Sequence, residues 1–211
     1  MSGALGVFGG TFDPVHLGHL AAAETAREAL GLERVLFVPA RRPPHKPGRP
    51  ISEAGHRVAM LELALADNPA FAIEPMELER DGPSYTVDTL AAITERVRAA
   101  GGIPDLVFVC STEALLDLPT WRNPTGILAL ARVAAVPRGR LDAPSPDWIA
   151  ERFAGLEGRI LLLDGPRIDI SASALRERVS AGRSIRYLVP DSVAAYIADN
   201  ALYRPTNGRT D

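Results

Sequence analysis

A glycine-rich turn between a short apolar run and a helical pattern constrains this chain more than any other feature. The turn, Gly9 to His19, reads Gly-Gly-Thr-Phe-Asp-Pro-Val-His-Leu-Gly-His, after the apolar run Leu5–Phe8 and before a helical pattern. Because the first backbone N–H groups of a helix lack intrahelical partners, and the helix dipole adds to their effect, such a helix start favours an anion. Gly9 and Gly10 let a phosphate approach the backbone without a Cβ in the way.

Two histidines close this turn. His16 and His19 are three positions apart, so they share a face if the helix has begun by then. The turn contains neither Gly-Lys-Ser/Thr nor G-x-G-x-x-G, which excludes the two commonest nucleotide-binding motifs. An ordinary strand-to-helix turn with two surface histidines is the alternative, but the whole string favours phosphate binding.

The turn resembles the signature of the nucleotidyltransferases that share His-x-Gly-His, the superfamily related to class I aminoacyl-tRNA synthetases. A second signature of that superfamily is Ile-Ser-x-Ser/Thr-x-x-Arg, and this chain has Ile170-Ser171-Ala172-Ser173-Ala174-Leu175-Arg176. Ser171 stands where a helix N-cap is expected, and Ser173 and Arg176 share a face of that helix. We therefore expect a second anion site, which the resemblance places on the β- and γ-phosphates of ATP.

Length and composition favour one globular domain. The chain has 211 residues, 46% of them hydrophobic and 23% charged, which suffices for a substantial core. We expect a nucleotidyltransferase domain over residues 1–203 and a flexible tail over 204–211. The net charge of −3 gives no argument for nucleic-acid binding. No apolar run suggests a membrane span or a secretory signal, and the single cysteine, Cys110, which we expect at a buried strand end, leaves no internal disulfide. These features predict a cytoplasmic protein and leave a homo-oligomer open.

Strand-like and helix-like patterns alternate along the chain. They predict an α/β fold, a Rossmann-like, doubly wound, mainly parallel sheet flanked by helices. The expected strands are Leu5–Phe8, Val35–Pro39, Phe71–Leu78, Leu106–Cys110, Arg132–Val136 and Arg159–Leu163. The expected helices are Leu17–Leu30, a segment capped by Ser52 that runs to Ala66, one capped by Ser84 or Thr86 that ends at Gly101, a short one after Glu113, Ala172–Ala181 and Pro190–Ile197.

A proline-rich basic loop, residues 41–50, follows the second expected strand. Its prolines exclude a helix or a central strand, and it contains Lys46, the only lysine of the chain. The loop lies after a strand's carboxyl end, the side on which open α/β sheets bind ligands. It could be only a solvated loop, but the family has a similar Pro-Pro-His-Lys segment, which implies a flap that borders the substrate.

The segment Gly82–Leu90 resembles the one that separates nicotinate-nucleotide adenylyltransferases from their relatives. The resemblance implies that Tyr85 and Thr86 bind the nicotinate nucleotide and that a Thr hydroxyl and backbone amides meet the pyridine carboxylate. It also implies that Trp121 stacks on the pyridine ring, although a lone tryptophan is also common in cores. Trp148 has no such context, and we expect it to pack.

The resemblance implies adenylyl transfer from ATP to nicotinate mononucleotide, with Mg²⁺ carried by the phosphates and no metal held by the protein. His16, His19, Lys46 and Arg176 are the implied catalytic residues, and Thr11 and Lys46 also bind the nicotinate nucleotide. The implied ATP-binding residues are Gly9, Gly10, Thr11, Phe12, His16, His19, Ser111, Glu113, Ile170, Ser171, Ser173 and Arg176. One departure stands out, because Ser111-Thr112-Glu113 replaces the family's Gly-x-Asp, so the glutamate that faces the ribose is a methylene longer.

Three alternatives remain open. Nicotinamide mononucleotide or phosphopantetheine could be the acceptor, although Gly82–Leu90 argues against the latter. The third alternative is a nucleotide sensor that kept the fold and lost the catalytic activity. The intact motif residues argue against it.

Overall fold

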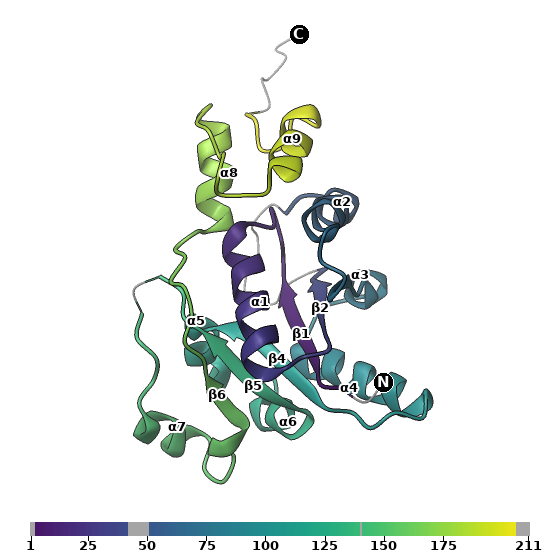
Figure 1. Cartoon of the computed structure of the whole chain (residues 1–211), viewed down its shortest axis with the longest axis vertical. Helices are drawn as coiled ribbons and strands as arrows, with labels where there is room; N and C mark the ends of the chain where they lie inside the picture. Colours follow the sequence, from purple (N-terminus) through teal and green to yellow (C-terminus); the bar gives the residue numbers. More distant parts are fainter. Residues whose placement is uncertain (1–2, 42–50, 140, 206–211) are drawn as a thin grey trace.

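The structure, a computed structural model, describes residues 3–41, 51–139 and 141–205. Lys46 and most of the proline-rich loop lie outside the described residues, as does most of the expected tail. Within the described ranges the chain folds as an α/β protein (Figure 1). The proposed division into residues 1–203 and 204–211 stays a prediction.

A parallel sheet organises the described residues. Its order is β3-β2-β1-β4-β5-β6, and every strand pairs with its neighbours in parallel, as the alternation of patterns predicts. Gly10 of β1 lies beside Pro39 of β2, and Ser111 of β4 lies beside Val136 of β5, so these carboxyl ends share one edge. The strands are β1 Leu5–Gly10, β2 Arg34–Pro39, β3 Phe71–Ile73, β4 Leu106–Ser111, β5 Ala131–Val136 and β6 Ile160–Leu162.

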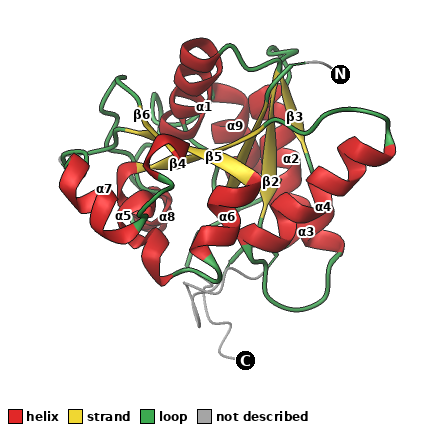
Figure 2. Ribbon diagram, turned by 90° about the horizontal axis from the view of Figure 1, so that it is seen from below, coloured by secondary structure: helices red, strands yellow, loops and turns green. Residues whose placement is uncertain are grey.

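Helices cover both faces of this sheet (Figure 2). They are α1 Leu17–Leu30, α2 Ala54–Leu65, α3 Met76–Glu79, α4 Thr86–Ala99, α5 Thr112–Asp117, α6 Pro124–Leu130, α7 Pro146–Arg152, α8 Ala172–Ser180 and α9 Asp191–Asp199, with 3-10 turns at Leu118–Thr120 and Glu157–Arg159. Successive residues of β4 pack on opposite faces of the sheet, so helices must cover both faces to bury them. Val107 and Val109 pack in the core that includes α1, α2, α8 and α9, whereas Phe108 and Cys110 pack in the core that includes α4, α5, α6 and α7. The pattern is therefore a doubly wound sheet, as predicted.

The C-terminal helices lie at the ligand-binding end of the sheet. Figure 1 shows α9 beside α2, and α8 close to the start of α1, both beyond the carboxyl ends of β1 and β2. Helices α2 and α9 pack against each other. The last part of the chain therefore covers the first part near the glycine-rich turn.

Two predicted helix caps are wrong. The cap of α2 is Glu53, and the backbone N–H of Ser52 instead donates to Asp13 Oδ2 at 3.1 Å. The cap of α4 is Tyr85, which contributes no side-chain hydrogen bond, while Ser84 Oγ accepts from the Arg41 backbone N–H at 3.3 Å. At Ser84 a long-range partner thus binds the hydroxyl that sequence reasoning assigned to a local cap, whereas at Ser52 the cap position lies one residue further along the chain.

The predicted strand Phe71–Leu78 is also wrong in its second half. β3 ends at Ile73, and α3 begins directly after Pro75. Proline lacks an N–H for the sheet and has a fixed φ that suits a helix start, so it ends the strand. A proline in this stretch indicates an edge strand or a bulge, and β3 is an edge strand of the sheet. Helix α6, with Asn123 as its cap and Pro124 at its first turn, is an element that the sequence analysis missed.

Other expectations are confirmed. Cys110 is buried at 5% exposure near the end of β4, and the Trp148 ring packs edge-on against Phe153 at 6.1 Å between centroids. The helix stop at Gly31 has the left-handed φ of 60° that glycine tolerates. In the described ranges no helix is long and apolar enough to cross a membrane.

Phe37 of β2 offers a test of the core. Its side chain is 0% exposed and its ring contacts the rings of Phe8, Phe12 and Phe71. We expect Phe37→Ala to lower the free energy of unfolding by about 3–5 kcal/mol in urea titrations, because it leaves a cavity under the glycine-rich turn. Leu63→Ala, at a side chain with 40% exposure on α2, is the control and should cost far less. Equal costs would contradict this account of the core.

Candidate active site

The glycine-rich turn joins the carboxyl end of β1 to the start of α1, as predicted. A Cβ on Gly10 would lie 3.0 Å from ring atoms of Phe12, so the close approach of that ring requires a glycine there. Phe12 has a φ of 49° and is 1% exposed, packed against the rings of Phe8, Phe37 and His19. The Phe12 side chain therefore holds the turn against the core, and the backbone of the turn lies at the carboxyl end of β1.

The two histidines of the turn lie together at the helix start. Their rings stack with centroids 3.6 Å apart and planes inclined by 22°. The backbone N–H of His16, the cap of α1, donates to Nδ1 of His19 at 3.2 Å. The predicted shared face is confirmed, and this hydrogen bond fixes Nδ1 of His19 as an acceptor, so a proton on a neutral His19 ring resides on Nε2.

His16 is buried and neutral. Its side chain is 1% exposed, and in the described ranges neither ring nitrogen has a hydrogen-bond partner. Burial, with a smaller contribution from the nearby charge of Arg138, lowers the pKa of His16 to about 3. A buried polar group without a protein partner is unusual and is a candidate for binding a ligand. At neutral pH His16 can therefore donate one hydrogen bond but adds no positive charge.

The second signature forms the other half of the site. Ser171 caps α8, its Oγ accepting from the Ala174 N–H at 3.1 Å, as predicted. From the same helix Arg176 donates through Nη2 to Ser173 Oγ at 3.3 Å and through Nη1 to the Asp13 carbonyl at 2.6 Å. The last bond ties the second signature directly to the first.

The two helix starts face one small cavity. It has a volume of about 130 Å³. Its lining includes residues of both signatures and one arginine from the segment after β5: Thr11, Asp13, His16, His19, Ile51, Arg138, Ser171, Ala172, Ser173 and Arg176. The two helix starts that the sequence predicts as anion sites therefore lie around one cavity.

A larger cavity of about 390 Å³ adjoins it and shares Thr11, His16, His19 and Arg138 with it. This cavity brings together most of the remaining predicted residues, namely Gly9, Gly10, Tyr85, Thr86, Ser111, Glu113 and Trp121. Of the predicted residues that the structure describes, two line neither cavity. The Phe12 side chain lies in the core, and the Ile170 carbonyl accepts a hydrogen bond from Arg138 Nη2 at 2.5 Å.

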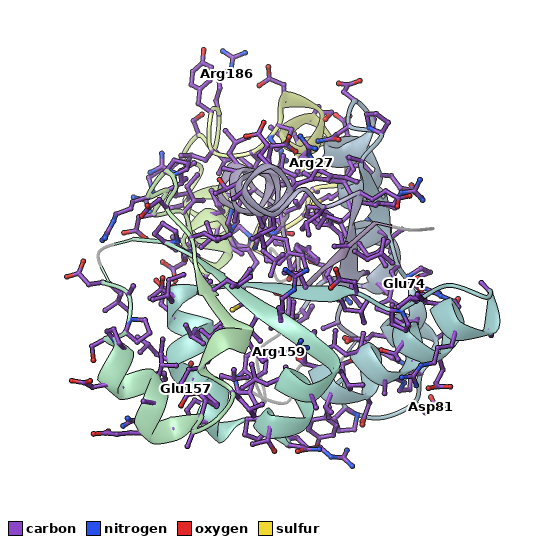
Figure 3. All side chains as sticks on the ribbon, turned by 60° about the horizontal axis from the view of Figure 1, so that its bottom comes forward. Arg27, Glu74, Asp81, Glu157, Arg159 and Arg186 are labelled. Atoms are coloured by element: carbon purple, nitrogen blue, oxygen red, sulfur yellow. The ribbon has the colours of Figure 1, made fainter. Side chains whose placement is uncertain are left out.

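One end of the larger cavity is lined by aromatic side chains. Tyr85 and Thr86 stand at the start of α4, and Trp121 packs edge-on against Phe108 with ring centroids 5.9 Å apart. The Arg41 guanidinium holds this end to β2, because Nη1 donates to both the Arg80 carbonyl and Asp81 Oδ1 at 2.9 Å. Figure 3 labels Asp81 at the periphery of the molecule, below Glu74.

The segment that departs from the family pattern lies on the cavity wall. Ser111 caps α5, its Oγ accepting from the Ala114 N–H at 3.3 Å, and Glu113 follows in the first turn. Glu113 Oε2 is buried and has no hydrogen-bond partner in the part of the chain that the structure describes. This carboxylate can therefore still accept hydrogen bonds from a ligand despite the longer side chain.

Sequence reasoning missed four residues of this region. Arg138 lines both cavities, Arg122 lines the aromatic end, and Asp13 and Arg57 are buried beside the turn at 1% and 2% exposure. The Arg57 guanidinium donates to the Thr11 carbonyl at 2.8 Å and to the Ser52 carbonyl at 3.1 Å. Only Asp13 carried a signal, its place inside the glycine-rich turn. In the described ranges no group of three or more His, Cys, Asp or Glu side chains could hold a metal ion.

Comparisons with known proteins show the family of this chain. A family model described as cytidylyltransferase-like matches residues 7–178. The probable nicotinate-nucleotide adenylyltransferase of Roseiflexus sp. (strain RS-1) is 46% identical over 205 residues, which cover 96% of this chain and 99% of the relative. The chain belongs to the nicotinate-nucleotide adenylyltransferase family. Another probable nicotinate-nucleotide adenylyltransferase, from Thermomicrobium roseum, is 48% identical over 202 residues, covering 95% of this chain and 91% of the relative.

Solved structures share the fold of this adenylyltransferase family. The Plasmodium falciparum nicotinic acid mononucleotide adenylyltransferase complexed with APC has a TM-score of 0.76 at 16% identity, covering 95% of this chain and 97% of that chain. The same enzyme complexed with NaAD has a TM-score of 0.75 at 17% identity, with the same coverage. The Rossmann-like fold predicted from the sequence is confirmed.

Gly18 provides a test of the histidine pair. A Cβ there would lie 3.1 Å from Nδ1 and 3.3 Å from Cε1 of His16, so Gly18→Ala must displace the buried ring. Because His16 borders both cavities, we expect ATP with Mg²⁺ to bind about tenfold more weakly by isothermal titration calorimetry, in line with the large cost of small displacements in such sites. Gly55→Ala on α2 is the matched control, since its Cβ would meet nothing within 4 Å. Equal ATP affinity in the two variants would show that the His16 position is unimportant.

Proposed function

We propose that this chain transfers the adenylyl group of ATP to nicotinate mononucleotide, giving nicotinate adenine dinucleotide and pyrophosphate, in NAD biosynthesis. The observation that carries the proposal is the convergence of two helix N-termini on one cavity that continues into a larger one with an aromatic end. Two anionic nucleotides need such an arrangement of phosphate donors beside a ring-binding surface. The family relationship and the titles of the structural neighbours, one with APC and one with NaAD, support it.

The reaction needs positioning more than it needs a reactive side chain. An oxygen of the mononucleotide phosphate attacks the α-phosphorus of ATP, a new P–O bond forms, and the bond to the bridging oxygen breaks to release pyrophosphate. The attacking oxygen is already anionic, so no side chain has to remove a proton from it. The protein brings two polyanions together and stabilises the charge that develops on the equatorial and leaving oxygens.

The residues of the smaller cavity are suited to that task. His16 and His19 donate hydrogen bonds to the α- and β-phosphates, while the backbone near Gly9 and Gly10 accommodates the triphosphate. Ser171, Ser173 and Arg176 hold the leaving pyrophosphate, and Thr11 lies between both substrates because it lines both cavities. We add Arg138 to this set, because its guanidinium is the cation that both cavities share. Lys46, outside the described residues, is proposed to steady a phosphate from the proline-rich loop.

Mg²⁺ is proposed to arrive with ATP and to supply further charge neutralisation when bound. The donor set fits a metal held by phosphates, because the side chains around the smaller cavity are mainly hydroxyl, imidazole and guanidinium groups. Asp13, the carboxylate there, already accepts hydrogen bonds through both of its oxygens.

The aromatic end of the larger cavity is proposed to bind the nicotinate ring. The Trp121 indole offers a face to an electron-poor pyridine, and the backbone and hydroxyl of Thr86 at the start of α4 suit a carboxylate. Glu113 is proposed to accept hydrogen bonds from the ribose of ATP. A cytoplasmic location and a homo-oligomeric state stay predictions.

Pyrophosphate release with ATP and Mg²⁺ tests the function directly. We expect release above background with nicotinate mononucleotide, less with nicotinamide mononucleotide and none with phosphopantetheine. His19→Ala should lower kcat on the order of 10²–10³-fold, the cost of losing a donor to transition-state charge. His56→Ala is the control, because His56 bonds to Tyr196 on α9 and lines neither cavity. A chain that binds ATP without releasing pyrophosphate would be the nucleotide sensor instead.

Arg122 is expected to contribute to the choice of acceptor. Its guanidinium carbon lies 4.6 Å from the centre of the Tyr85 ring, at the aromatic end of the cavity, and its Nη1 lies 3.4 Å from Asp88 Oδ2. A cation there favours a ring carboxylate over a carboxamide, but its side chain is 58% exposed, so the effect is modest. We expect Arg122→Gln to lower the ratio of kcat/KM for nicotinate over nicotinamide mononucleotide about two- to fivefold.

Arg98→Gln is the matched control for this substitution. Arg98 is a similarly exposed arginine of α4, at 61%, that pairs with Glu95 and lines neither cavity. An unchanged ratio in the Arg122 variant, or the same change in both, would remove Arg122 from acceptor selection.

A further inference from the structure

The end of the described chain reaches back to the glycine-rich turn. The Tyr203 hydroxyl, four residues after α9, donates to Asp13 Oδ1 at 2.6 Å across 190 positions of sequence. Its oxygen also lies 4.0 Å from Met60 Sδ, and the ring packs against the core that contains α1, α2 and α9. Tyr203 therefore contacts the phosphate-binding turn without lining either cavity.

Asp13 links Tyr203 to Arg176, which lines the smaller cavity. Its carboxylate, 1% exposed, accepts from Tyr203 through Oδ1 and from the Ser52 N–H through Oδ2. Its backbone carbonyl accepts from Arg176 Nη1 at 2.6 Å, while Oδ2 of the same residue lies 4.0 Å from that nitrogen. The guanidinium thus donates its hydrogen bond to the backbone carbonyl, and the carboxylate is only a distant ion-pair partner.

The Tyr203 hydroxyl determines which of the two Asp13 groups can hold Arg176. Burial and the neighbouring Asp13 raise the pKa of Tyr203, so its hydroxyl stays protonated and remains a donor. Without it, one oxygen of a buried carboxylate loses its partner, a costly state that the nearest cation relieves. Rotation of the carboxylate would bring one of its oxygens within hydrogen-bond distance of Arg176 Nη1, which now lies 4.0 Å from Oδ2, and would turn this long ion pair into a direct one. An Arg176 engaged in that way is less available to a phosphate.

We propose that Tyr203 is a positioning residue for the triphosphate side of the site, which acts through Asp13 to keep Arg176 oriented toward phosphate. The proposal rests on the proposed function and goes beyond it, because Tyr203 touches no substrate. It assigns a catalytic consequence to the segment that follows α9. The pyridine-binding end is not involved, because Tyr203, Asp13 and Arg176 all lie outside the larger cavity.

Tyr203→Phe tests this proposal, because it removes one oxygen and keeps the packed ring. The matched control is Tyr196→Phe on α9, whose hydroxyl bonds to His56 Nδ1 at 2.9 Å. Both variants lose one tyrosine hydroxyl that ties the C-terminal segment to another part of the chain. Only Tyr203 ties it to the turn, so a general loosening of this segment would affect both variants alike.

The measurements are the equilibrium binding of ATP with Mg²⁺ in the absence of acceptor, and steady-state kinetics with each substrate varied. We expect Tyr203→Phe to weaken ATP binding and to lower kcat/KM for ATP about tenfold, the effect of losing a hydrogen bond to a charged group. The KM for nicotinate mononucleotide should stay within about twofold. Tyr196→Phe should leave both substrates within about twofold of the unaltered chain.

A double-substitution cycle with Arg176→Ala identifies the route. If Tyr203 acts through Arg176, Tyr203→Phe should add less than about twofold in the Arg176→Ala background. Full additivity, unchanged ATP binding in Tyr203→Phe, or equal effects of Tyr203→Phe and Tyr196→Phe would each overturn the proposal. ATP binding without transfer to nicotinate mononucleotide would overturn the proposed function alone, because the binding comparison among the variants still applies.

Discussion

The hydrogen bond from Arg176 to the carbonyl of Asp13 is the contact on which the site depends. It joins the start of α8 to the turn that precedes α1, although the two segments are separated by most of the chain. Each helix start alone is a weak and common anion site. Together they line one cavity from two sides. In the proposed reaction they can therefore bind the phosphates on both sides of the bond between the α-phosphorus and the bridging oxygen. The parallel sheet makes this feasible, because its strands deliver their following turns to one edge.

The sequence was sufficient for the parts of the site that local chemistry specifies. The glycine-rich turn, the stacked pair His16 and His19, and the Ser171 cap of α8 follow from short-range spacing and helix geometry, and the structure contains all three. The α/β alternation likewise predicted a doubly wound parallel sheet. Pro75 is a visible signal of an edge strand or a bulge, and β3 is an edge strand of the sheet, but the sequence pattern does not show that the strand ends at Ile73 and that α3 follows Pro75.

What could not be predicted depends on partners that are distant in sequence. Ser84 has the right chemistry for a cap, yet its hydroxyl accepts from the distant Arg41 backbone N–H, and the backbone N–H of Ser52 donates to the distant Asp13 while Glu53 is the cap of α2. Arg138 is one arginine among many until β5 places it between the two cavities. Tyr203 looks like an ordinary residue near the end of the chain, and only the folded chain shows its contact with Asp13. Local patterns thus located the helix starts, whereas the groups that hold these starts together required three-dimensional information.

The buried, uncharged imidazole of His16 has a consequence for how the site meets its highly charged substrates. With a pKa of about 3, this ring stays uncharged throughout the physiological range, and the cations around it in the described ranges, Arg138 and Arg176, are guanidinium groups that keep their charge. The electrostatic potential that these three groups present to incoming anions is therefore almost constant. Acidification of the cell would change the ionisation of the nucleotides' own phosphates before it changed the charge of these three groups.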